Sequence, residues 1–94
     1  MTAPLEPVAR PAPRPGFVLE ELGGELVIYH PATEVIFYCN ATAALIWKLC
    51  DGVRDVAAIT TLLAEAYPQA AERMSADVHA TLMEFLHHHA IDLK

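Results

Sequence analysis

The sequence predicts an α+β fold, in which a three-stranded antiparallel sheet is followed by three helices packed on one of its faces (β-β-β-α-α-α). Before Asn40, the chain consists of short runs of β-forming residues that are separated by turn signals. After Asn40, the apolar residues recur at helical spacing instead. The chain has 94 residues, of which 54% are hydrophobic, so one small domain can bury a core of its own.

Three short runs rich in β-forming residues predict the strands. They cover residues 17–21, 26–30 and 34–39. The pair Gly23-Gly24 favours a hairpin between the first two runs, and Pro31 marks the second reversal of the chain. The strands therefore form a meander. We expect the third strand at the edge of the sheet, where its unpaired N–H and C=O groups can accept another strand.

Polar capping residues predict where three helices begin. We expect these helices over residues 41–50, 56–67 and 76–89. Asn40, Asp55 and Ser75 each precede one of them and can accept hydrogen bonds from its first backbone N–H groups. Pro68 stops the second helix, and residues 68–74 are expected to form the loop before the third.

The first sixteen residues differ in composition from the rest of the chain. They contain five of the seven prolines. Each proline fixes φ and removes a backbone donor, so neither a helix nor a central strand is expected there. We therefore expect residues 1–16 to be a flexible arm and residues 17–94 to be the folded domain.

Charge and composition argue against several classes of protein. The formal net charge is -6, whereas a nucleic-acid binder needs a basic surface that neutralises phosphates. No run reaches the about 18 consecutive apolar residues of a membrane-spanning helix, and no signal peptide is evident. Cys39 and Cys50 have the spacing of neither a zinc site nor a disulfide framework. We expect a cytoplasmic protein that binds neither membranes nor nucleic acid.

The residue sets needed for catalysis or metal binding are not evident. Ser75 is the only serine, and no glycine-rich phosphate loop occurs, so we expect neither an enzyme nor a cofactor. His79, Met83 and His87 line one face of the third predicted helix and are of types that suit copper or zinc. Their two imidazoles are separated by about 12 Å of helix, which is too far for one ion, so a surface stripe or a partner groove is favoured over a metal site.

A binding surface is the remaining expectation. An exposed third strand beside the third helix forms a groove with a backbone ladder on one wall and side chains on the other. Such a groove favours β-augmentation, in which an extended peptide adds a strand to the sheet.

The segment from Asn40 to Gly52, NATAALIWKLCDG, resembles the pattern LN-x-T-A-x-x-I-W-x-L-x-D-G of the PqqD family, the pyrroloquinoline quinone biosynthesis protein D group. Residues 56–59, and Asp77-Val78 with the leucines after them, are similar to the family's second and third helices. The resemblance covers about residues 17–93. Departures from the family pattern are Cys39 in place of Leu, Arg54-Asp55 in place of Thr, and Ala90 in place of Gly.

The resemblance implies a winged-helix-like recognition element. Family members bind the leader of a ribosomally made precursor peptide between the third strand and the third helix, and deliver it to a modifying enzyme, often a radical S-adenosylmethionine enzyme. The resemblance fits both the quinone pathway and another peptide pathway. By position, the groove residues here would be Val35, Ile36, Phe37 and Tyr38 on the strand and Ala80, Met83, Glu84 and His87 on the helix.

A winged-helix transcriptional regulator is the alternative function. It would need a recognition helix that carries Lys or Arg, but the second predicted helix has neither and the third has none after Arg73. This absence favours the peptide binder. The exposed third strand also makes a homodimer or a strand-swapped dimer a reasonable expectation, with the turn at Pro31 as the hinge.

Overall fold

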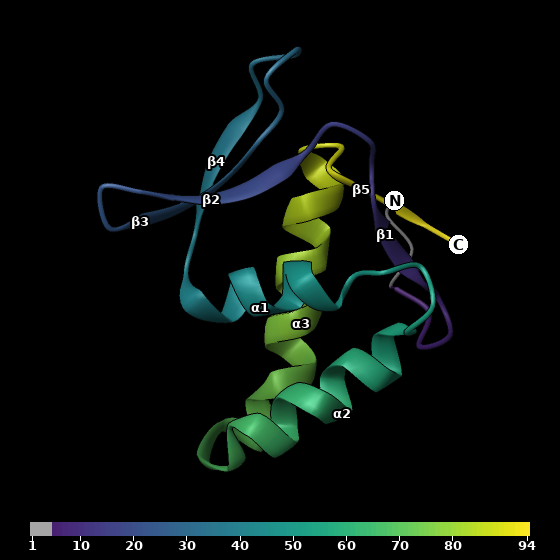
Figure 1. The fold of residues 1–94 in the computed structure, drawn as a ribbon. Coiled ribbons are helices and arrows are strands. Elements are labelled where there is room, and N and C mark those ends of the chain that lie inside the picture. Colours follow the sequence, from purple (N-terminus) through teal and green to yellow (C-terminus); the bar gives the residue numbers. More distant parts are fainter. Residues whose placement is uncertain (1–4) are drawn as a thin grey trace.

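The computed structural model describes residues 5–94 of the chain. It contains the predicted antiparallel sheet, built from β2 (Val18–Leu22), β3 (Glu25–Tyr29) and β4 (Ile36–Cys39) in the order β2-β3-β4. The α+β class, the meander and the position of the third strand at the sheet edge are therefore confirmed. Figure 1 shows the sheet on one side of the long helix α3 (Ala71–His87).

The first two helices begin where the capping residues predict. Helix α1 (Ala41–Leu49) starts after Asn40, whose side chain accepts a hydrogen bond from the backbone N–H of Ala43 at 2.8 Å. Helix α2 (Val56–Ala66) starts after Asp55, which accepts a bond of 2.8 Å from Ala58. Each cap satisfies a backbone donor that has no partner within the helix.

The third helix begins earlier than predicted. The sequence predicts a loop over residues 68–74 and a cap at Ser75, and both predictions are wrong. A 3-10 helix (Pro68–Ala70) leads directly into α3, and Ser75 is an exposed residue within that helix. Residues 71–74 are good helix formers, and burial of Met74 in the core stabilises this additional turn.

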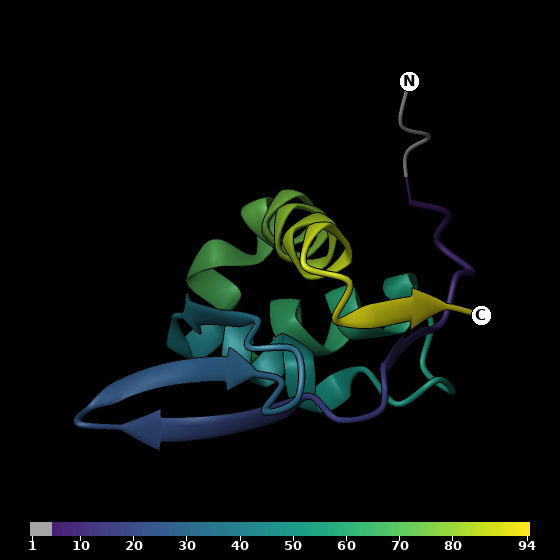
Figure 2. The same cartoon turned by 90° about the horizontal axis from the view of Figure 1, so that it is seen from above.

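The proline-rich segment forms a strand that the sequence analysis missed. Strand β1 (Pro11–Pro13) pairs antiparallel with β5 (Ile91–Leu93), and the pair lies apart from the β2-β3-β4 sheet, next to the C-terminal end of α3 (Figure 2). This pairing tolerates prolines because the residues that alternate with them supply the donors. The N–H of Arg10 donates to the carbonyl of Lys94 at 2.9 Å, and the N–H of Arg14 donates to the carbonyl of Ala90 at 2.8 Å. The mobility predicted for residues 1–16 and the boundary at residue 17 remain predictions, and residues 1–4 lie outside the described part.

A single hydrophobic core joins the sheet to the helices. The inner face of the sheet contributes Ile28 and Phe37, and all three helices contribute buried side chains. Trp47 of α1 lies edge-on against Phe85 of α3, with ring centroids 5.5 Å apart. This packing fixes α3 beside β4 and so sets the geometry of the space between them.

Candidate functional site

One edge of β4 carries backbone groups that no described strand uses. The N–H of His30 donates to the carbonyl of Val35 at 2.9 Å, and the register pairs Ile28 with Phe37. Because bonding alternates along an antiparallel pair, the N–H and C=O groups of Ile36 and Tyr38 point away from β3. Among residues 5–94 no strand pairs with this edge, so its N–H groups can donate, and its C=O groups can accept, a total of two to four hydrogen bonds with an added strand.

A groove runs between this edge and helix α3. It consists of two adjoining hollows of about 150 and 220 Å³, which share Asn40 and Thr81. We call it the β4–α3 groove. Its lining residues are Phe37, Tyr38, Cys39, Asn40, Thr42, Ala43, Asp77, Ala80, Thr81, Glu84 and Phe85.

The structure brings together four of the eight residues that the sequence assigns to peptide binding. Phe37, Tyr38, Ala80 and Glu84 line the β4–α3 groove. Ile36 is 57% exposed and Tyr38 69% exposed on the outer face of the sheet. Val35, Met83 and His87 do not line the groove. The role of all eight residues in binding remains a prediction.

Helix α3 presents a slightly different face to the groove than the sequence predicts. Asp77, Thr81, Glu84 and Phe85 lie along this face, at spacings of three and four residues. The predicted face shares Ala80 and Glu84 with the observed one but is rotated about the helix axis, so Thr81 and Phe85 were missed. The apolar side chain of Phe85, four residues after Thr81, is the signal that identifies this face.

An aromatic stack limits the groove at the C-terminal end of α3. The ring of His88 lies parallel to that of Phe37, with centroids 4.1 Å apart and an interplanar angle of 7°. Phe85 packs against the same Phe37 ring at 5.9 Å. The Phe37–His88 stack therefore ties α3 to β4 and separates the groove from a second cavity.

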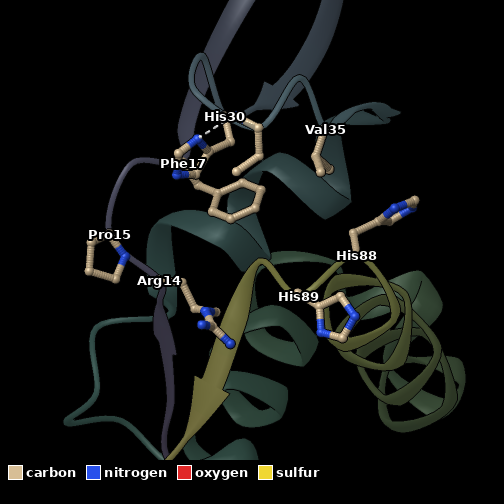
Figure 3. Close-up of a pocket in the computed structure, with 8 residues that line it drawn as sticks. Arg14, Pro15, Phe17, His30, Val35, His88 and His89 are labelled. Carbon is tan, nitrogen blue, oxygen red and sulfur yellow. Dashed lines mark hydrogen bonds between the residues drawn. The ribbon is translucent and has the colours of Figure 1, made fainter.

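That cavity, which we call the Arg14 pocket, has a volume of about 590 Å³. Figure 3 shows Arg14 and His89 on one side of it and Phe17 and Val35 on the other. The remaining lining residues are Pro15, His30, Thr33 and His88. The pocket thus combines the N-terminal segment, the turn between β3 and β4, and the end of α3.

His30 holds the N-terminal wall of the Arg14 pocket in place. Its Nδ1 accepts hydrogen bonds from the backbone N–H groups of Ala32 and Thr33, at 3.1 and 3.3 Å. Its ring meets that of Phe17 edge-on, with centroids 5.0 Å apart. The imidazole is therefore fixed between the β3–β4 turn and the chain segment that includes Gly16.

Substitution of Gly16 by alanine is expected to destabilise the protein through this contact. Gly16 has a φ of +95°, and an added Cβ would lie 2.3 Å from Nε2 of His30. Gly23 is the matched control, because its φ is +59° but nothing lies within 4 Å of an added Cβ. Gly23→Ala should lower the free energy of unfolding by about 1 kcal/mol for the left-handed backbone alone. In urea unfolding, Gly16→Ala should lower the free energy of unfolding by at least about 1 kcal/mol more than Gly23→Ala does. Equal decreases in the two variants would show that the His30 ring is not fixed in this position.

The sequence of residues 25–91 determines the family of this chain. The sequence pattern of the PqqD family, described as coenzyme PQQ synthesis protein D, matches residues 25–91. The chain belongs to the PqqD family. The resemblance noted from Asn40 to Gly52 is thereby confirmed, while Arg14 and Phe17 lie outside the matched residues.

A solved structure shares the fold of this PqqD-family protein. It is described as "TbiB1 in Complex with the TbiA(beta) Leader Peptide". The TM-score is 0.70 at 17% sequence identity, and the similarity covers 86% of this chain and 94% of TbiB1. No curated protein sequence matches the chain.

The described residues contain no cluster of metal ligands. Within residues 5–94, no three His, Cys, Asp or Glu side chains come close enough together to hold a metal ion. His79 is half-buried on α3 and His87 is exposed. No helix in the described part of the chain is long and apolar enough to cross a membrane.

The two thiols of this PqqD-family protein are weakly acidic. Burial, and secondarily the Glu84 carboxylate, raises the pKa of the Cys39 thiol in the groove. Burial, and secondarily the Asp51 carboxylate, raises the pKa of the Cys50 thiol from 9.0 to about 12. A nucleophilic cysteine needs a stabilised thiolate, so neither environment favours thiol catalysis.

The raised pKa of the Cys50 thiol makes the protein less stable at alkaline pH. Below pH 9 both the folded and the unfolded chain hold this thiol proton, and between pH 9 and about 12 only the unfolded chain loses it. The free energy of unfolding should therefore fall by about 1.4 kcal/mol from pH 7 to pH 10 through this group. Urea unfolding of the Cys50→Ala variant should lack this part of the decrease. The same decrease in both proteins would contradict the burial of the thiol.

Proposed function

We propose that this PqqD-family protein is a non-catalytic adaptor that binds the leader of a ribosomally synthesised precursor peptide and presents it to a modifying enzyme. The observation that carries the proposal is the open edge of β4, where Ile36 and Tyr38 present backbone groups that no described strand uses, beside the β4–α3 groove. An extended peptide satisfies such an edge by adding a fourth strand to the sheet.

Strand addition uses both walls of the groove. The peptide backbone bonds β4, and alternate peptide side chains point toward α3 or toward the outer face of the sheet. Side chains that point toward α3 enter the space lined by Cys39, Thr81 and Glu84. Those that point outward cover Ile36 and Tyr38, whose apolar surfaces are exposed in the free protein. Burial of this surface contributes about 25 cal/mol for each Å² removed from water.

The comparisons support a peptide as the ligand. TbiB1, which shares this fold, is described in complex with a leader peptide. Membership of the PqqD family supports a role beside an enzyme of peptide maturation. We propose a radical S-adenosylmethionine enzyme of the cytoplasm as that partner, with no cofactor held by the adaptor itself.

The same edge offers a route to self-association. Two β4 edges can pair antiparallel across a twofold axis, which would give a homodimer, and opening of the turn after His30 would give a strand-swapped form. A leader peptide would compete with either dimer for Ile36 and Tyr38. Sedimentation with and without the peptide would therefore measure both equilibria.

Calorimetric titration of the full chain with the short peptides encoded beside its gene tests the proposed function. We expect one of these peptides to bind with a micromolar dissociation constant, and a scrambled peptide of the same composition to fail. The modifying enzyme encoded nearby is then added, because presentation requires a ternary complex. Failure of every such peptide to bind, with and without the enzyme, would overturn the proposal.

A further inference from the structure

We propose that the Arg14 pocket is a second subsite, which binds an apolar side chain together with an adjacent carboxylate of the peptide held at β4. The proposal rests on the proposed function for the source of this ligand. The chemistry of the ligand is inferred from the pocket itself, which lies beyond the Phe37–His88 stack at the end of the groove.

The pocket has the size and lining of a ligand site. Its volume of about 590 Å³ exceeds that of either groove hollow and lies within the roughly 300–1,000 Å³ typical of ligand pockets. Phe17, Pro15 and Val35 provide apolar surface, and the rings of the histidines add aromatic faces. An apolar or aromatic side chain is therefore the part of the ligand that would fill the interior.

The charged and titratable residues that line the pocket are all of the basic type. Arg14, His30, His88 and His89 line it, and none of its lining residues in the described part of the chain is acidic. The whole chain has a net charge of -6, and the groove contains Asp77 and Glu84. The pocket thus differs in charge from the groove that it adjoins, and a ligand that carries a carboxylate complements it.

Arg14 is available to a ligand. Its guanidinium group has Asp92 as its neighbour, at 3.6 Å, and both side chains are about half exposed. Exposed pairs of this kind contribute about 0–1 kcal/mol, so a ligand carboxylate can compete for the guanidinium group. The backbone of Arg14 is fixed by its 2.8 Å bond to Ala90, which keeps the side chain at the pocket. A planar guanidinium group also binds a carboxylate through two parallel hydrogen bonds.

The position of the pocket defines a spacing in the bound peptide. Val35 lines the pocket and Cys39 lines the groove, and four residues of strand span about 13 Å. A strand paired with β4 therefore places two side chains four positions apart, one in each cavity, with the Phe37–His88 stack between them. Because Arg14 and Phe17 lie outside residues 25–91, this second contact would distinguish the chain from relatives that share only the matched region.

A small probe tests the pocket separately from the groove. We would titrate isotope-labelled full chain with N-acetyl-Phe-Asp-amide and with the neutral analogue N-acetyl-Phe-Asn-amide, and follow backbone amide shifts by NMR. We expect the acidic dipeptide to bind at millimolar concentration with shifts centred on Phe17, His30 and His89. The neutral analogue should bind about threefold to tenfold more weakly, which is the effect of one charged contact.

Three variants test whether the Arg14 guanidinium group recognises the carboxylate of the acidic dipeptide. Arg14→Gln should remove the preference for the acidic dipeptide, and Arg10→Gln is the control, because Arg10 is exposed in the same segment but does not line the pocket. Asp92→Asn should strengthen the binding of the acidic dipeptide, because it removes the competing carboxylate. If Arg14 had only a structural role, Arg14→Gln and Asp92→Asn would not change the affinity for the acidic dipeptide in opposite directions.

The outcomes separate this proposal from the proposed function. Equal binding of the two dipeptides, shifts centred on Thr81 and Asp77, or no shifts at millimolar concentration would each overturn the Arg14 subsite. None of these results affects the titration with leader peptides. Conversely, dipeptide binding in a protein that binds no leader peptide would overturn the proposed function and show that the pocket serves another acidic ligand.

Discussion

Replacement of Tyr38 by proline is expected to weaken peptide binding strongly and to leave the fold intact. The N–H of Tyr38 points to the open edge of β4 rather than to β3, so its removal breaks no hydrogen bond of the sheet. An added strand would lose that bond, which contributes about 0.5–1.5 kcal/mol net, and would meet the proline ring at the position where its own backbone must lie. We expect affinity for the leader peptide to fall by at least about tenfold.

Tyr38→Ala is the matched control for this experiment. It removes the same exposed side chain and uncovers the same cross-strand neighbour, Val27, but keeps the backbone N–H. Calorimetric titration of the two variants, with circular dichroism to establish the fold, separates the backbone from the side chain. Equal affinities of Tyr38→Pro and Tyr38→Ala would show that the peptide does not pair with this edge.

Truncation of Phe85 to alanine is expected to lower the free energy of unfolding by about 3–5 kcal/mol. The side chain is 1% exposed and packs against the rings of Phe37 and Trp47, at centroid distances of 5.9 and 5.5 Å. Its removal leaves a cavity at the point where the sheet, α1 and α3 meet. Stability of about 0.05–0.15 kcal/mol per residue is typical, so a loss of this size would bring a small domain close to unfolding.

Urea unfolding of Phe85→Ala measures this loss, and Val53→Ala is the control. Val53 is 76% exposed, and its truncation should change the free energy of unfolding by no more than about 0.5 kcal/mol. A loss below about 1 kcal/mol for Phe85→Ala would contradict the proposed packing between β4 and α3.

Local signals in the sequence predict most of the fold. The change from strand runs to helical spacing at Asn40 divides the sheet from the helices, and Asn40 and Asp55 act as the caps that their positions predict. The Gly23-Gly24 pair lies at the hairpin turn. Each of these features depends on residues close together in the chain, which explains why the sequence alone predicts them.

Long-range contacts account for what the sequence did not predict. Pairing of β1 with β5 joins residues at opposite ends of the chain, and no local pattern in a proline-rich segment indicates a partner so distant. Ser75 has the chemistry of a cap, but the burial of Met74 extends the helix beyond it. Tertiary packing therefore overrides the local preference at that position.

The candidate site shows the same division between local and long-range information. The open edge of β4 follows from the order of three strands in a meander, and the sequence predicts it correctly. The face of α3 that borders the groove depends on how the helix is rotated in the fold, which spacing alone does not determine. The Arg14 pocket depends on three separate segments, so no sequence motif marks it.

Hydrogen exchange at two amides tests leader binding by strand addition most directly. The N–H groups of Ile36 and Tyr38 have no partner strand within residues 5–94, whereas that of Phe37 bonds within the sheet. A saturating leader peptide should slow exchange at Ile36 and Tyr38 by at least about tenfold, since each would gain a backbone acceptor. Unchanged exchange at both amides in the saturated complex would contradict strand addition at β4 and place the peptide elsewhere on the protein.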